Sequence, residues 1–281
     1  MDPLPSFFAF LIALVSGAFG SVLGIGGGLF IIPSLTLFLF VPLKTAIAAS
    51  VIAVIATSLG GGNRYVRQHL ADIRLGLLLA LATAPGAVVG ALVATHVSAR
   101  VLAAVFALVL LASAYRMVVR GGAAPAAAAT VETEDRGLQF KGEYLEPSTG
   151  EAVRYRILGV PFGVGASALA GLISGMLGVG GGIIQVPVMS LVMRAPIKVA
   201  AATSTYIIGI TAMAGAFVYY NHRPSFVDPS LAVPVTLGVF LGSQVGSRVL
   251  SRISQVALRR FFTVVLVAYT IQMVLRVFGI G

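Results

Sequence analysis

The 281-residue chain contains no cysteine and no tryptophan, and only nine of its residues are acidic. The lack of cysteine excludes disulfides, thiol catalysis and thiolate-bound metals. Six of the nine acids lie between residues 120 and 156, and the others are Asp2, Asp72 and Asp228, so no carboxylate lies deep in an apolar run. Proton-relay carboxylates, metal-ligand clusters and catalytic triads are thus missing. We expect no enzyme, no metal and no cofactor.

What the chain has in excess is apolar sequence. Hydrophobic residues make up 58% of it and charged residues 10%, and the mean hydropathy is +1.01. Apolar runs long enough to span a membrane recur along the chain, as is typical of membrane-spanning helices. The sequence therefore predicts an all-α polytopic membrane protein that lies in a lipid bilayer. Its expected membrane segments are residues 6–23, 29–43, 45–62, 73–95, 99–119, 157–178, 183–194, 197–219, 229–249 and 257–278.

The basic residues indicate the topology. If every segment changes side, fifteen of the nineteen Lys and Arg residues fall on one face. By the positive-inside rule that face is cytoplasmic, which puts both termini outside and the loop 121–156 inside, in the inner membrane of a bacterium. The net charge of +10 thus reflects membrane orientation and does not predict a nucleic-acid partner.

One glycine-rich motif occurs twice. Residues 23–28, Leu-Gly-Ile-Gly-Gly-Gly, are followed by Pro33 and recur 154 positions later as Leu-Gly-Val-Gly-Gly-Gly at 177–182, followed by Pro187. Glycine costs about 1 kcal/mol relative to alanine inside a helix, so each copy should interrupt a helix. Irregular backbone within a bilayer is tolerated where protein or a water-filled cavity covers it. Two such breaks at matched positions indicate the binding site of a transporter.

The repeat extends beyond the glycines. At the same offset Pro42-Leu43-Lys44 matches Pro196-Ile197-Lys198, and Ser50 and Tyr65 match Ser204 and Tyr219; at an offset of 156, Asp72, Gly86 and Gly90 match Asp228, Gly242 and Gly246. Each half holds five segments, an odd number, so the halves should be inverted relative to each other. The predicted architecture is two inverted five-segment repeats, 1–120 and 157–281, joined by a polar cytoplasmic linker, 121–156.

Four local features accompany this architecture. Segments 29–43 and 183–194 are too short to cross the hydrocarbon core, and we expect them to enter the membrane and turn back at the glycines. In the linker, apolar runs on both sides of residues 147–150 predict a small β-hairpin, with either a connecting or a partner-docking role. Asp72 and Asp228 follow polar turns, where aspartate caps helices. The spacing of Gly86 with Gly90, and of Gly242 with Gly246, favours helix packing.

The deep polar groups suggest a site for a small anion. Backbone N–H groups at helix starts attract anions, and glycine allows a ligand to approach closely. The alternative is structural, since serine and threonine in membrane helices often bond their own helix backbone. The candidate substrate-binding residues are Gly24, Gly26, Gly27, Gly28, Ser50, Gly178, Gly180, Gly181, Gly182, Gln185, Thr203, Ser204 and Thr205. Lys44, Lys198, Asn63 and Arg64 are candidates for anion attraction, with membrane anchoring or topology as the alternative.

The two glycine motifs with their prolines, and the Pro-x-Lys and Ala-Thr-Ser residues at 196–204, resemble the sulfite exporter TauE/SafE family, also called the 4-toluene sulfonate uptake permease family. The resemblance covers both halves. It implies a membrane transporter for sulfite, sulfoacetate or other organosulfonates, and we expect export by alternating access at the two glycine-rich helix ends. A channel-like anion conductor and a cation-coupled importer of a small metabolite remain as alternatives, and the partners would be a small anion, the bilayer and, in an oligomer, a second copy.

Overall fold

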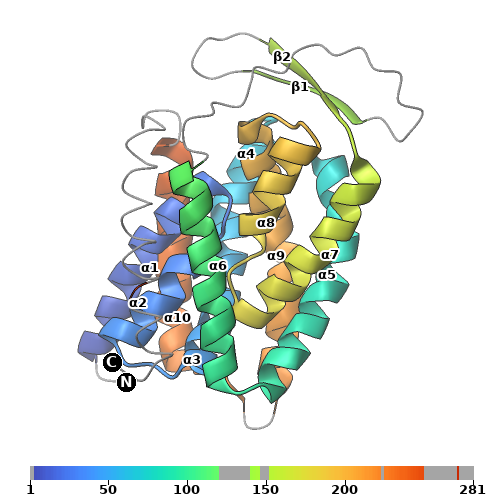
Figure 1. Cartoon of the computed structure of the whole chain (residues 1–281). Coiled ribbons are helices and arrows are strands. Elements are labelled where there is room, and N and C mark those ends of the chain that lie inside the picture. The colour runs from blue at the N-terminus through green and yellow to red at the C-terminus, as the bar shows by residue number, and fades with distance from the viewer. Residues whose placement is uncertain (1–2, 120–139, 146–151, 223–224, 250–270, 272–281) are drawn as a thin grey trace.

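In the computed structural model, long helices run roughly side by side, and a small hairpin lies across one end of them (Figure 1). The structure describes residues 3–119, 140–145, 152–222, 225–249 and 271. The longer helices are α1 (Pro3–Leu23), α3 (Leu43–Thr57), α5 (Ile73–His96), α6 (Ala99–Val119), α7 (Val160–Leu177), α9 (Ile197–Asn221) and α10 (Pro229–Val249). The shorter elements are α2 (Gly28–Phe38), α4 (Asn63–Arg67), α8 (Gly182–Pro187) and the π-helical turns Ser58–Gly62 and Val188–Val192.

Six helices in the described part of the chain are long and apolar enough to cross a membrane. One of them is continuous from Leu43 to Arg67 through the π-helical turn. The two segments predicted to be short are short in the structure. Helix α2 has 11 residues, and α8 with the π-helical turn after it runs only from Gly182 to Val192. The helical membrane class is thus confirmed. The ten-segment inverted repeat stays a prediction, and its last segment, 257–278, falls almost wholly outside the described residues.

Two helix pairs flank the centre, α1 with α10 and α5 with α7, and α3 packs against α9 between them. Glycines allow the outer pairs to approach closely, because a Cβ at each would collide with a carbonyl oxygen of the facing helix. The predicted packing role of these glycines is confirmed. The contacts of the two pairs recur at the repeat offsets: Gly86 with Ala168, Gly90 with Leu172, Gly242 with Leu14 and Gly246 with Ala18.

The predicted hairpin of the linker is present. Strand β1 (Phe140–Leu145) pairs antiparallel with β2 (Ala152–Ile157), and Phe140 lies opposite Ile157. Val153 and Tyr155 of β2 pack against a small apolar cluster at the helix ends, formed by Tyr65, Leu70, Val199 and Ala202. The hairpin is therefore docked on the helical part rather than separate from it.

Both predicted aspartate caps are confirmed. Asp72 precedes α5, and its Oδ1 accepts a hydrogen bond of 3.0 Å from the backbone N–H of Leu75. Asp228 precedes α10, and its Oδ1 accepts a bond of 2.9 Å from the N–H of Ser230. The Ser230 hydroxyl also donates to Asp228 and holds the pKa of this carboxyl below its usual value. Each carboxylate satisfies a helix-start N–H that has no partner inside the helix.

We expect Asp72→Ala to lower the stability of the protein by about 1 kcal/mol, because it removes the cap of α5. It also removes the acceptor of the Tyr155 hydroxyl, 3.4 Å away, which ties the hairpin to α5. The check is the thermal midpoint of the purified protein in detergent. Asp72→Asn keeps an oxygen for the Leu75 N–H and should lose less, and equal losses for both variants would contradict the capping role.

Candidate functional site

The two glycine-rich segments form matching turns, one before α2 and one before α8. Both contain glycines with left-handed backbone angles, which other residues adopt rarely. In the first turn, φ is 72° at Gly24, 85° at Gly26 and 84° at Gly27; in the second, it is 66° at Gly178, 83° at Gly180 and 69° at Gly181. The helices then begin at Gly28 and Gly182. The predicted interruption of the helices by glycine is confirmed.

The turns of the two halves contact each other at the centre of the molecule. A Cβ on Gly28 would collide with the carbonyl oxygen of Gly178, and a Cβ on Gly182 would collide with that of Gly24. Ser50 of α3 donates its hydroxyl to Gly178 O at 2.8 Å, and Ser204 of α9 donates to Gly24 O at 2.8 Å. Each half therefore holds the glycine turn of the other half with one buried serine.

Two tyrosines support the helix ends beside the turns. The Tyr65 hydroxyl donates to Ser21 O at 3.1 Å, and the Tyr219 hydroxyl donates to Gly175 O at 2.8 Å. Both rings are 1% exposed. The sequence showed these tyrosines as a matched pair but gave them no role. The two tyrosines are 154 positions apart, and so are their acceptor residues, Ser21 and Gly175. This match to the repeat offset was the sequence signal that could have identified their shared role.

The other predicted hydroxyls bond to different groups. Thr205 donates to Ala201 O of its own helix at 2.9 Å. Thr203 accepts a bond of 2.9 Å from the backbone N–H of Asp72, at the hairpin end. Thr57, which was not among the candidates, donates to Gly26 O at 2.9 Å. The structure thus brings Ser50 and Ser204 to the turns, and it ties the hydroxyls of Thr203 and Thr205 elsewhere.

Gln185 adds an amide to this centre. Its side chain is 2% exposed, and its Oε1 accepts a bond of 3.5 Å from the Ser204 hydroxyl. Its Nε2 is buried and has no hydrogen-bond partner among the described residues. A buried amide donor without a partner is costly, so the group needs an explanation. The residue 154 positions earlier, its counterpart in the first half, is the aliphatic Ile31.

The four candidates for anion attraction do not gather at the turns. At the start of α3, Lys44 donates to Thr95 O at 2.9 Å and lies 5.3 Å from the centre of the Phe226 ring. Lys198 is half-buried near the start of α9, next to the apolar cluster under the hairpin. Asn63 and Arg64 belong to α4, where Asn63 is exposed. These residues lie at the ends of the helices, as membrane anchors or topology signals would.

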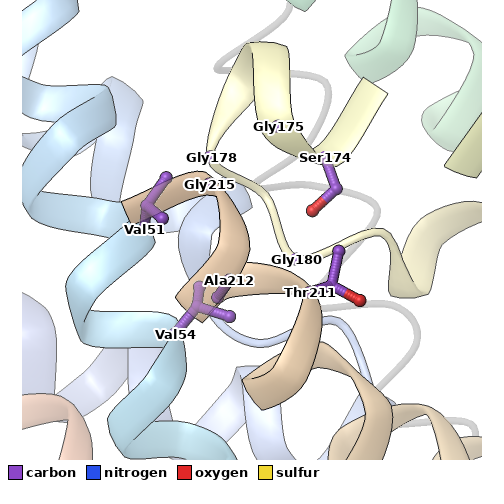
Figure 2. Close-up of a pocket in the computed structure, with 9 residues that line it drawn as sticks. All are labelled: Val51, Val54, Ser174, Gly175, Gly178, Gly180, Thr211, Ala212 and Gly215. Atoms are coloured by element: carbon purple, nitrogen blue, oxygen red, sulfur yellow. The ribbon is translucent and has the colours of Figure 1, made fainter. Parts of the chain in front are cut away.

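A gap lies beside the second glycine turn, between α3, α7 and α9 (Figure 2). It contains about 180 Å³ of space not filled by atoms and is too narrow to hold a water molecule. Its polar side chains are Ser174 and Thr211, and both are buried. The sequence did not single out Ser174. The lining residues are Val51, Val54, Ser174, Gly175, Gly178, Gly180, Thr211, Ala212 and Gly215.

The buried centre is polar without being charged. Among the described residues, the buried polar side chains are serines, threonines and one glutamine. Such a centre offers hydroxyl, amide and backbone N–H donors at the interruptions of membrane helices. Together with the six membrane-length helices, this defines the chain as a polytopic helical membrane protein with a polar, uncharged centre.

The comparisons with known proteins agree with this class. The chain matches the family described as sulfite exporter TauE/SafE over residues 9–273 and belongs to that family. It is 25% identical to the probable membrane transporter protein YunE of Bacillus subtilis over 94% of this chain and 95% of that protein. It is 27% identical to YdhB of the same organism, over 89% and 93%, and 24% identical to MJ0441 of Methanocaldococcus jannaschii, over 89% and 88%; both carry the same description. No solved structure matches the chain.

Proposed function

We propose that the protein transports small sulfur-containing anions, such as sulfite, sulfoacetate or other organosulfonates, and exports them by alternating access at the two glycine turns. The observation that supports this proposal is that the two glycine turns contact each other at the buried centre of the protein. The chain also belongs to the sulfite exporter family. The family description supports the substrate class, and the contact between the glycine turns supports this location for the site. Transport rather than catalysis is the activity of this centre.

The hydrogen bonds at the centre favour an anion over a cation. Carbonyl oxygens are the groups that would bind Na⁺, and three of them already accept a hydroxyl: Gly24 O, Gly26 O and Gly178 O. At the start of α2, Phe30 and Ile31 donate to Gly27 O at 2.9 and 3.1 Å, which leaves the N–H groups of Gly28 and Leu29. The helix dipole adds partial positive charge there, and this supports an anion as the ligand.

The closed centre supports alternating access over an open channel. The gap at the second turn does not admit water, so a ligand reaches it only when the surrounding helices move. At the end with Lys44, a cavity of about 340 Å³ lies between the segments 39–45 and 225–231 and would serve as a vestibule. Export needs little coupling, because an inside-negative potential of 100 mV favours the exit of each negative charge by about 2.3 kcal/mol.

The proposed orientation follows from the charges at the helix ends. Arg64, Arg67 and Arg154 lie at the end that carries the hairpin. Under the positive-inside rule this end faces the cytoplasm, and the termini face outward across an inner membrane. Labelling of single cysteines in this cysteine-free chain tests the orientation directly, and a hairpin cysteine labelled from outside intact cells would contradict it.

We expect sulfite or a sulfonate to raise the thermal midpoint of the purified protein, while sulfate and Na⁺ have smaller effects. A ligand that binds the folded state alone stabilises it by RT ln(1 + [L]/Kd), about 2.7 kcal/mol at a hundredfold excess over Kd. Efflux of radiolabelled sulfite from proteoliposomes is the transport assay. Stabilisation by Na⁺ together with Na⁺-driven uptake would favour an importer, and flux that does not saturate would favour a channel.

A further inference from the structure

The two halves of the centre differ in the residues that line the gap. Ser174, Gly175, Ala212 and Gly215 line the gap in the second half, and their counterparts 154 positions earlier are Gly20, Ser21, Ser58 and Gly61. Gly175 and Ala212 therefore stand where the first half has serines, and Ser174 stands where the first half has a glycine. The second half thus has smaller side chains at two of these positions and a hydroxyl at a third.

The first half fills the corresponding space. Ser21 donates its hydroxyl to Ser243 O at 3.1 Å, and Ser58 donates to Tyr206 O at 3.0 Å. A Cβ on Gly61 would lie 2.5 Å from Ser21 Oγ, whereas a Cβ on its counterpart Gly215 would have no heavy atom closer than 3.7 Å. The space next to Gly215 is thus less filled than the corresponding space next to Gly61.

The hydrogen bonds of the matched threonines also differ between the two halves. In the first half Thr57 donates to the turn at Gly26 O. Its counterpart Thr211 donates away from the turn, to the Thr83 hydroxyl at 2.9 Å, and Figure 2 shows its oxygen directed away from Val51 and Val54. The Ser174 side chain, only 4% exposed, points toward Gly180. The gap therefore has a buried hydroxyl beside the glycine backbone of the second turn.

We infer that the oxyanion head group of the substrate binds at the second glycine turn and not at the first, in the widened form of this gap, with the Ser174 hydroxyl as a donor. This inference rests on the proposed function, from which it takes the sulfite or sulfonate as the ligand. A small oxyanion needs few contacts, and a hydroxyl with adjacent backbone N–H groups supplies donors without a buried counter-charge. The first half then acts as the closed side of the site.

Two variants test the inference, and each has a matched control. Gly215→Ala adds one methyl to the gap, in ordinary contact with Val51 Cγ1 at 3.7 Å and Gly175 Cα at 3.9 Å. Its control is Gly165→Ala on α7, where a Cβ meets nothing within 4 Å. Ser174→Ala removes the donor. Its control is Ser16→Ala, an equally buried serine of α1 whose counterpart is already an alanine, Ala170.

We expect Ser174→Ala to weaken sulfite binding at least about tenfold, the effect of losing one hydrogen bond to a charged group. Gly215→Ala should weaken binding to a similar extent because its methyl fills part of the gap, while both controls bind as the wild type does. Since alanine suits a helix better than glycine, Gly215→Ala should melt at or above the wild-type temperature, which separates lost binding from lost folding. Wild-type affinity in both variants would overturn the inference and leave the proposed function standing. A wild-type protein that binds neither sulfite nor any sulfonate would overturn both.

Discussion

Replacing Gly182 with alanine is expected to abolish transport and to lower the stability of the protein by several kcal/mol, the cost typical of overpacking a rigid core. The new Cβ would collide with Gly24 O, and Ile25 Cα would lie only 2.9 Å away. Backbone atoms cannot move aside as a flexible side chain can, so the two glycine turns must separate. Their separation would also break the bond from Ser204 to Gly24 O.

The same substitution elsewhere provides the controls. Gly28→Ala is the equivalent change in the first half, where the Cβ would meet Gly178 O and lie 2.7 Å from Ser50 Oγ, and it should fail in the same way. Gly165→Ala should keep full transport and stability. Measurements of folded yield, thermal midpoint and sulfite efflux for the three variants decide the matter. Normal efflux by Gly182→Ala would show that the turns need not touch during transport.

The sequence was sufficient to locate the glycine turns, the aspartate caps and the hairpin. Four glycines in five residues within an apolar run predict an interrupted helix, and both turns have positive φ values where expected. The aspartate caps and the hairpin also followed from local patterns, since a cap depends on residues three positions apart and a hairpin on neighbouring strands. Local chemistry determines such features, and therefore the sequence reveals them.

The partners of the hydroxyl groups could not be predicted in this way. Ser50 bonds to a carbonyl 128 positions away and Ser204 to one 180 positions away, whereas Thr205 bonds to its own helix four positions back. All three are small hydroxyl residues in the same sequence context. The direction in which each points depends on the packing of α3 and α9 against the opposite turn, which no local pattern encodes.

The difference between the two halves of the centre could be predicted from the sequence only in part. The repeat alignment alone shows that Ser21 and Ser58 are replaced by Gly175 and Ala212. The consequence, a gap at one turn, appears only when the three helices around the turn are in place. The exchange of Ile31 for Gln185 is of the same kind, and it introduces an amide whose nitrogen has no partner among the described residues.

Gln185→Met is therefore expected to separate stability from binding. Methionine has a similar length and shape and no amide, so the change removes a buried donor that costs about 1–3 kcal/mol while unpaired. Ser204 keeps its bond to Gly24 O at 2.8 Å and loses only the contact of 3.5 Å with Gln185. We expect the variant to melt at or above the wild-type temperature.

Sulfite binding by Gln185→Met should nevertheless weaken at least about tenfold, because a ligand oxygen would lose its hydrogen bond from the Nε2 group. The matched control is Gln244→Met, the same change at a half-buried glutamine of α10, which should bind as the wild type does. Calorimetric titration with sulfite, run beside thermal melting, measures both effects. A variant that binds normally and melts lower would show that the amide is a structural group and does not contact the substrate. Weaker binding at an unchanged or higher melting temperature would support a direct contact between the Gln185 amide and the ligand.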